Sequence, residues 1–265
     1  SWIWQFEPEE LEELHAATLA LKATGKGPEV SNPDDFPLSA FSSAIAEIRD
    51  ELAEGRGFIL LRGIDVDRYD PETLELLFWG FQAHLGTIIS QNSQGDLLGH
   101  VTDRGENYEL GSHYESNVRG HRTRSELNPH TDSCDVVGLL CVRPAKSGGT
   151  SSICSSMAIY NECQAQHPEF IEPLTNGFYF DLIGKGSKET EYTETRTPGF
   201  IFHHGYLSSR FNKRQIELGI SRSGNGLTDF ETAAIDYRIY ISARKPFLQH
   251  MPTTQADVQL PQHLR

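Results

Sequence analysis

The segment that most constrains this chain runs from His130 to Ser151 and reads HTDSCDVVGLLCVRPAKSGGTS. It places a histidine and an aspartate two positions apart, just before an apolar run that ends at Pro144. Successive side chains of a strand point to opposite faces, so His130 and Asp132 share one face and Thr131 points away. The segment therefore predicts two side chains that can reach one metal ion at the mouth of a strand.

The donor types favour iron over structural zinc. One neutral imidazole and one carboxylate, completed by a second imidazole, form the facial triad of non-heme Fe(II) oxygenases, which leaves positions open for a co-substrate and oxygen. Asp135 is a weaker substitute for Asp132, because its odd spacing from His130 places it on the opposite face. A short motif also occurs by chance, and the alternative is a turn-capping aspartate beside a core histidine.

The flanking sequence predicts short strands with helices packed around them. Val136 to Val142 is apolar and β-branched and predicts a buried strand, followed by a turn at Lys146 to Gly149. Further strands are expected at 58–61, 151–156, 178–182 and 199–202, and helices at 37–54, 71–84 (with Asp70 as N-cap) and 156–166.

Length and charge bound the class of protein. A chain of 265 residues can form a single domain, which we expect to span residues 1–265. A net charge of −14 argues against nucleic-acid or anionic-membrane partners. The absence of an 18-residue apolar run or signal-like start predicts a soluble, cytoplasmic protein. The four cysteines show no C-x-x-C spacing, so reduced core thiols are preferred to disulfides.

Residues 87–126 are polar and glycine-rich with little periodicity. Such a length is unusual for a structureless connection inside a compact domain. We therefore expect a lid or active-site loop there.

The segment from His130 to Ser151 resembles the metal-binding core of the taurine dioxygenase (TauD/TfdA) family of Fe(II)/2-oxoglutarate-dependent oxygenases. The similarity extends to GRGFILLRG (55–63), to SQNSQGDLLGHVTD (90–103), and to SSRFNKRQIE (208–217), which corresponds to a later strand and turn. Within the family, the chain resembles the fungal and bacterial branch that acts on small amino-acid-like or secondary-metabolite substrates, including enzymes that close an aziridine ring on an amino acid. The resemblance implies a mainly β, α+β fold with flanking helices, built as a double-stranded β-helix (jelly roll).

The same resemblance assigns residues to 2-oxoglutarate. A hydroxyl group that binds one carboxylate of this co-substrate corresponds to Ser151, with Thr150 as a rival. The distal carboxylate requires an arginine, because a guanidinium grips a carboxylate with two hydrogen bonds. Arg265 falls in the matching segment.

Arg210 is the candidate for binding a substrate carboxylate, with Asn212, Gln91 and Asn92 as polar neighbours. The alternative is that Arg210 is a charge on a solvated turn. His203 and His204 are adjacent and suit a structural role better than a ligand role.

The family pattern breaks near the C-terminus. The second histidine ligand is expected on a strand after residues 246–260, but the sequence passes from ADVQL directly to PQHLR. We therefore expect a segment to be absent between Leu260 and Pro261. If the two residues are truly consecutive, His263 or His250 could supply the third ligand, although His263 lies too close to Arg265 for the family spacing.

The sequence thus predicts an Fe(II)/2-oxoglutarate-dependent oxygenase that oxidises an unactivated C–H bond of a small molecule with O₂ and releases succinate and CO₂. Hydroxylation and oxidative cyclisation remain open, as does the oligomeric state. The alternatives are a zinc-type metal hydrolase and a non-catalytic, cupin-like ligand-binding jelly roll. The chain has no G-x-S-x-G elbow, P-loop or dinucleotide fingerprint.

Overall fold

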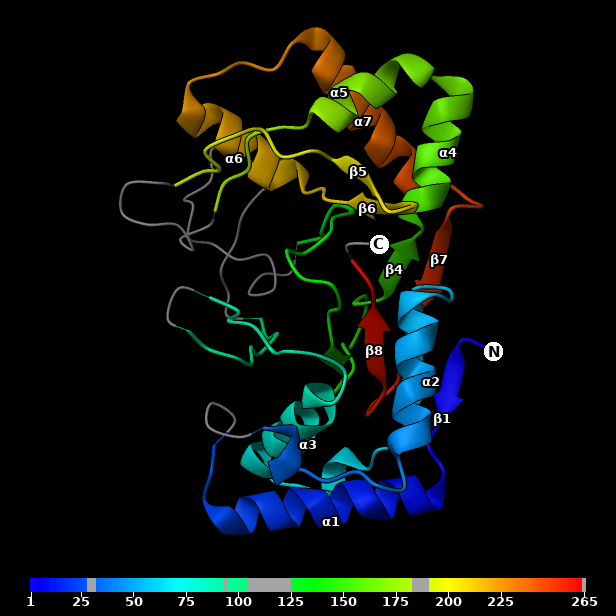
Figure 1. Cartoon of the computed structure of the whole chain (residues 1–265), viewed down its shortest axis with the longest axis vertical. Coiled ribbons are helices and arrows are strands. Elements are labelled where there is room, and N and C mark those ends of the chain that lie inside the picture. Colours follow the sequence, from blue (N-terminus) through cyan, green and yellow to red (C-terminus); the bar gives the residue numbers. More distant parts are fainter. Residues whose placement is uncertain (28–31, 93–94, 104–124, 183–190, 264–265) are drawn as a thin grey trace.

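The structure is a computed structural model and describes residues 1–27, 32–92, 95–103, 125–182 and 191–263. Helices and strands are arranged along one long axis, with α1 and α3 at one end and α4 to α7 at the other (Figure 1). The helices are α1 (Pro8–Thr24), α2 (Ser42–Ala53), α3 (Pro71–Ala83), α4 (Ser156–Gln166), α5 (Ile171–Asn176), α6 (Lys213–Ser223) and α7 (Asp229–Ser242). The strands are β1 (Ile3–Gln5), β2 (Phe58–Arg62), β3 (Leu139–Leu140), β4 (Ser151–Cys154), β5 (Phe200–His203), β6 (Tyr206–Ser209), β7 (Leu248–Met251) and β8 (Val258–Pro261).

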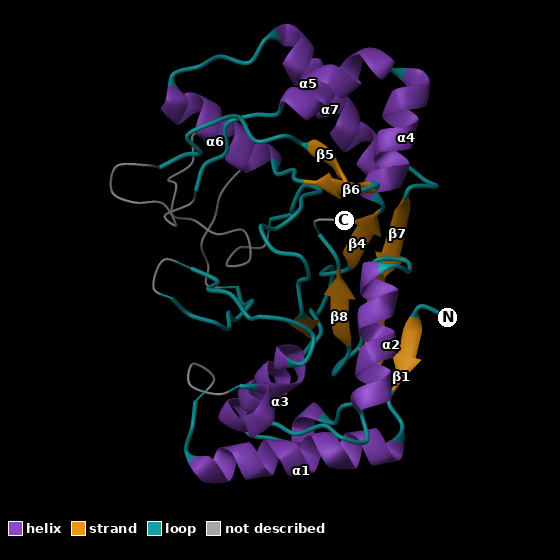
Figure 2. Cartoon of the chain, viewed as in Figure 1, coloured by secondary structure: helices purple, strands orange, loops and turns teal. Residues whose placement is uncertain are grey.

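Three separate sheets occur in the described part of the chain. The largest has the strand order β1-β2-β8-β3, and the other two are the pairs β4-β7 and β5-β6. Strand β8 lies in the middle of the molecule, where it pairs in antiparallel fashion with both β2 and β3 (Figure 2). Leu260 and Pro261 are neighbours within β8, opposite Ile59 and Phe58 of β2. An absent segment at this join stays a prediction from the family resemblance.

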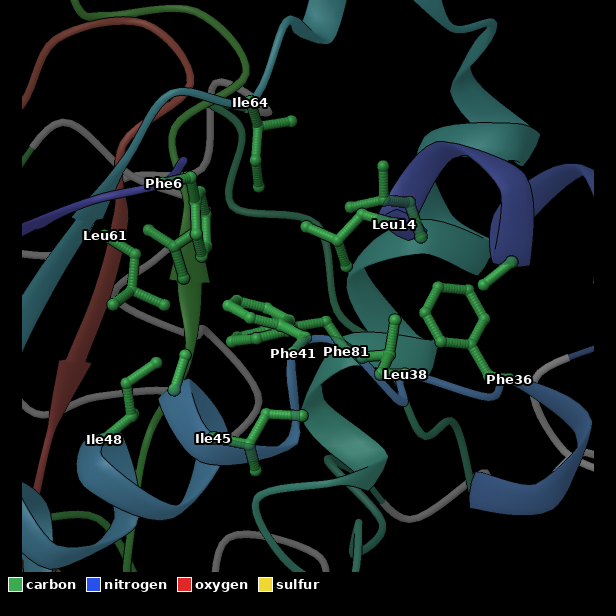
Figure 3. Packing of buried hydrophobic residues seen from close by; sticks show 14 of the residues in the cluster. Phe6, Leu14, Phe36, Leu38, Phe41, Ile45, Ile48, Leu61, Ile64 and Phe81 are labelled. Atoms are coloured by element: carbon green, nitrogen blue, oxygen red, sulfur yellow. The ribbon is translucent and has the colours of Figure 1, made fainter. Parts of the chain in front are cut away.

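One hydrophobic core fills the space between α1, α2, α3 and the β2-β8 pair. Figure 3 shows Phe6, Phe41 and Phe81 meeting at its centre. The ring centroids of Phe6 and Phe41 lie 5.3 Å apart, and those of Phe41 and Phe81 lie 5.7 Å apart. Tilted and edge-on aromatic contacts of this kind add about 1 kcal/mol each beyond the burial of apolar area.

A second core lies between α4, α5, α6, α7 and the β5-β6 hairpin, with Arg238 of α7 in its centre. The Arg238 side chain donates to the Gly199 carbonyl at 3.2 Å and to Ser209 Oγ at 2.6 Å. Its guanidinium carbon lies 4.3 Å from the ring centroids of both Phe200 and Phe211. Burial lowers the pKa of Arg238 to about 9, so the side chain remains charged at neutral pH. It joins helix α7 to both strands of the hairpin.

Several predicted elements are confirmed. Strand β2 and helix α3 match the expected ranges, and Asp70 accepts the Thr73 backbone N–H at 2.9 Å as the N-cap of α3. Helix α4 also forms over the expected range, with Ser155 as its N-cap. Helix α2 begins only at Ser42, five residues after the expected start. The cysteines are free thiols, but only Cys163 is buried.

Other expectations are wrong. Helices, not strands, make up most of the regular structure among the described residues, so the fold is α+β but not mainly β. The run from Val136 to Val142 forms only the two-residue strand β3, and Leu139 is 40% exposed and Val142 43% exposed. Apolar composition alone did not reveal that one face of this run is uncovered. Residues 213–217, expected as a turn, instead begin α6, which Asn212 caps by accepting the Gln215 N–H.

Gly219 of α6 lies directly against the backbone of residues 179 and 180. A Cβ atom at this position would lie 2.5 Å from the Tyr179 carbonyl oxygen and 2.7 Å from the Phe180 carbonyl carbon. Gly219→Ala is therefore expected to lower the free energy of unfolding by about 2 kcal/mol, because overpacking outweighs the better helix propensity of alanine. Urea unfolding measures this change. Gly226→Ala is the control, since nothing lies within 4 Å of its Cβ position, and an equal loss there would contradict the packing argument.

Candidate metal centre

The predicted ligand segment crosses between the two halves of the molecule. On one side, His130 forms an isolated antiparallel bridge with Asn212, just before α6. On the other side, Val136 bridges to Gln262, and β3 pairs with β8. The geometry of the candidate ligands therefore depends on how both cores hold this segment.

The ring of His130 is oriented by a hydrogen bond at one nitrogen. Its Nδ1 lies 2.7 Å from the carbonyl oxygen of Asn128. A carbonyl can only accept, so Nδ1 carries the proton and Nε2 keeps its lone pair in the neutral ring. This is the usual way in which a second hydrogen bond fixes the tautomer of a metal-binding histidine.

Thr131, between the two candidate ligands, is bonded to the backbone of Phe211. Its backbone N–H donates to the Phe211 carbonyl at 2.7 Å, and its Oγ1 accepts the Phe211 N–H at 2.9 Å. These bonds fix the backbone between His130 and Asp132. The segment is thereby attached to the second core through Phe211, which is 2% exposed.

Asp132 and His263 are adjacent although 131 residues separate them in the sequence. The backbone N–H of Asp132 donates to His263 Nδ1 at 2.7 Å, and Asp132 Oδ2 lies 3.5 Å from the same nitrogen. The Asp132 side chain is 51% exposed, whereas that of His263 is 16% exposed. Burial lowers the pKa of His263, the Asp132 carboxylate opposes this shift, and His130 adds to it. A lowered pKa agrees with a neutral ring that accepts at Nδ1.

His130 and Asp132 have the donor types of two of the three protein ligands of a facial triad, and their role as ligands stays a prediction. His130 offers Nε2, and Asp132 offers an exposed carboxylate. His263 lies beside them, but its Nδ1 is occupied by the Asp132 N–H, so in this arrangement it supports Asp132. No group of three His, Cys, Asp or Glu side chains in the described part of the chain is arranged to hold a metal ion.

The residues assigned to 2-oxoglutarate are only partly described. Ser151 is the first residue of β4, half-buried and opposite Met251 of β7, and Thr150 just before it is exposed. Arg265 lies outside the described residues. These three roles stay predictions.

The residues assigned to the substrate fall into two groups. Arg210 and Asn212 flank Phe211 and so lie next to His130 in the fold. Gln91 and Asn92 belong to a local turn, in which Gln91 Nε2 donates to the Ile89 carbonyl at 2.7 Å and Asn92 Nδ2 to Asp96 at 2.6 Å. Their role in binding stays a prediction.

The remaining histidines lie elsewhere. His250 is exposed on β7, with its Nδ1 2.8 Å from Ser152 Oγ of β4. His203 and His204 lie at the exposed end of the β5-β6 hairpin, with ring centroids 4.1 Å apart.

Sequence reasoning missed the supporting groups of this centre, namely the Asn128 carbonyl, the Phe211 backbone and the position of His263. Two of them are backbone groups, which leave no signature in the sequence.

No described helix is long and apolar enough to cross a membrane.

Solved structures with the same fold are non-heme iron oxygenases. Asparagine oxygenase in complex with Fe(II), 3-hydroxyasparagine and succinate has a TM-score of 0.72 at 12% identity, over 100% of this chain and 86% of that chain. The oxygenase OrfP in complex with (3S)-hydroxy-L-Arg has a TM-score of 0.66 at 16% identity, over 99% of this chain and 85% of that chain. The fold is thus that of non-heme iron oxygenases.

The chain belongs to the taurine catabolism dioxygenase TauD/TfdA family, whose model matches residues 20–255. Among curated relatives, FR-33289 synthase of Streptomyces rubellomurinus is 29% identical over 225 residues, which is 84% of this chain and 65% of that protein. The taurine hydroxylase-like protein SAT17 of Stachybotrys chartarum is 29% identical over 171 residues, 64% of this chain and 44% of that protein. The matched region thus spans less than two thirds of either relative.

Proposed function

We propose that this protein is an Fe(II)/2-oxoglutarate-dependent oxygenase that oxidises a C–H bond of a small amino-acid-like or secondary-metabolite substrate, by hydroxylation or oxidative ring closure. The observation that carries the proposal is the pair formed by His130, whose Nδ1 is engaged by the Asn128 carbonyl, and the exposed carboxylate of Asp132. Membership of the TauD/TfdA family supports the choice of iron and 2-oxoglutarate. A double-stranded β-helix around β8 is part of the same proposal.

The protein's own contribution is to bind and orient the reactants. His130 and Asp132 hold the metal. The third ligand is a histidine of the strand that the family resemblance expects after residues 246–260 or, if Leu260 and Pro261 are truly consecutive, His263. Ser151 or Thr150, together with Arg265, bind the carboxylates of 2-oxoglutarate. When bound, the iron supplies the oxidising chemistry, with O₂ as oxidant and 2-oxoglutarate converted to succinate and CO₂.

An amino-acid-like substrate is supported by the solved structures that share the fold. Asparagine oxygenase holds 3-hydroxyasparagine, and OrfP has been solved with L-Arg and with L-homoarginine. The low identity of these proteins means that they support the size and type of substrate, not its side chain.

One observation favours a non-catalytic ligand-binding role as the second candidate. The described residues provide two metal ligands and not three, and a binding module does not require a complete triad. A zinc hydrolase would also use these ligands, but it would act without O₂ or 2-oxoglutarate.

Succinate release tests the proposed function. The full-length protein with Fe(II), 2-oxoglutarate and O₂ is expected to release succinate slowly, and faster when the substrate is present. Removal of O₂, or replacement of Fe(II) by Zn²⁺, should stop the release. Release that continues with Zn²⁺, or no release under any of these conditions, would contradict the oxygenase assignment.

A further inference from the structure

Arg238 and Arg210 both place their guanidinium groups against phenylalanine rings of the second core, and they differ in how the charge is accommodated. Arg238 is 2% exposed, donates to Gly199 and Ser209, and is enclosed by two phenylalanine rings. These hydrogen bonds and ring contacts accommodate the buried charge of Arg238, so its role is structural. Arg210 lacks this set of contacts.

Arg210 follows β6 and is half-buried. Its guanidinium carbon lies 4.6 Å from the ring centroid of Phe180, which is completely buried. Among the described residues, the buried Nε has no hydrogen-bond partner. Burial lowers the pKa of Arg210, and no described carboxylate forms an ion pair with it. Removing a cation from water without a counter-charge costs free energy. The simplest explanation for the position of the Arg210 guanidinium is therefore an anionic ligand that binds it.

The register places Arg210 on the face that carries the candidate metal ligands. In the antiparallel bridge between His130 and Asn212 the two paired residues share a face. Arg210 is two positions before Asn212 and so shares that face, as Asp132 does two positions after His130. The burial pattern agrees, because Ser209 and Phe211 are 1% and 2% exposed on the opposite face.

We infer that Arg210 is the anchor for a carboxylate group of the substrate, held beside the metal on a guanidinium that stacks on Phe180. The inference rests on the proposed function and narrows its substrate to a carboxylate-bearing molecule such as a free amino acid. A planar guanidinium can bind a carboxylate through two parallel hydrogen bonds, and no described carboxylate already occupies the donors of Arg210.

The test uses the full-length protein under anaerobic conditions with Fe(II) and 2-oxoglutarate. The visible band of the iron complex is recorded while the twenty proteinogenic L-amino acids, and the carboxamide of each one that binds, are added in turn. Arg210→Met removes the charge, Arg210→Lys keeps the charge without the planar fork, and Lys213→Met removes a neighbouring cation that is already paired with Asp236. A thermal melt of each variant confirms folding.

In the wild type, at least one amino acid is expected to shift the band, and its carboxamide is expected to bind much more weakly. Arg210→Met should weaken amino-acid binding by about 100-fold and Arg210→Lys by about tenfold, with Lys213→Met unchanged. The band itself should persist in all folded variants. If Arg210→Met removes the band, Arg210 binds 2-oxoglutarate instead and the inference is overturned.

The inference is also overturned if amino-acid binding is unaffected in Arg210→Met. The same holds if no amino acid binds to the wild type through its carboxylate. If the wild type forms no band at all, the proposed function itself fails, and this result is distinct from the other outcomes.

Discussion

Replacing His130 with alanine is expected to remove Fe(II) binding and, with it, all succinate release. The Nδ1 of His130 donates to the Asn128 carbonyl, so the ring presents Nε2 as a ligand, and alanine offers no replacement. Loss of a group that merely supports a ligand costs 10- to 100-fold in metal affinity. Removal of the ligand itself should therefore exceed about 100-fold. Competition with a metal-sensitive dye, followed by a succinate assay, measures both effects.

His250→Ala is the matched control for this experiment. It removes the same side chain from an exposed position on β7, where His250 contacts Ser152 of β4. Metal affinity should be unchanged. Equal losses in the two variants would show that the ligand set derived from the structure is wrong.

Asp257→Asn is expected to produce the largest loss of stability, about 3 kcal/mol at pH 7. Both carboxylate oxygens of Asp257 accept hydrogen bonds from Arg62 at 2.8 Å, and Oδ2 also accepts from the backbone N–H and Oγ1 of Thr254. The Asp257 side chain is completely buried, whereas that of Arg62 is 36% exposed. Breaking such a pair leaves an uncompensated charge, which costs about 3–5 kcal/mol when both groups are buried. Because Arg62 is partly exposed, we expect the loss of stability to lie at the low end of this range.

The loss of stability in Asp257→Asn should depend on pH. Burial alone would raise the pKa of Asp257, but the bonds from Arg62 and Thr254 outweigh it and hold the pKa below its ordinary value. The contribution is therefore complete above the unfolded pKa of about 3.9, and it is lost as the pH falls through the folded pKa. Urea unfolding at pH 7 and pH 3 should show a smaller difference between Asp257→Asn and wild type at pH 3.

Asp67→Asn is the control for this pair, because Asp67 pairs with Arg143 at the surface, where both side chains are more than 60% exposed. Its expected effect is below about 1 kcal/mol. A pH-independent loss in Asp257→Asn, or an equal loss in Asp67→Asn, would contradict the assignment.

Local sequence signals predicted part of the fold correctly. Asp70 and Pro71 marked the start of α3, and the apolar stretch from residue 58 marked β2, because caps and buried strands are specified by neighbouring residues. The prediction missed α1, α5, α6 and α7. The length of strand β3 was overestimated, because the apolar run around it did not show that Leu139 is exposed.

The candidate site was predicted only as far as local spacing allowed. The two-residue spacing of His130 and Asp132 predicted that the two side chains share one face. The position of His263 against Asp132 depends on a contact over 131 residues, and the Arg62–Asp257 pair joins residues 195 apart. Such contacts are created by the packing of β8 against β2 and β3, which no local pattern specifies.

The central claim is that this chain holds Fe(II) and 2-oxoglutarate together through His130 and Asp132. The most direct measurement is the visible spectrum of the metal-free, full-length protein after anaerobic addition of Fe(II) and then 2-oxoglutarate. A weak charge-transfer band that forms only when both are present, and that is absent in His130→Ala, is the predicted result. Failure of the folded wild-type protein to develop this band would contradict the account.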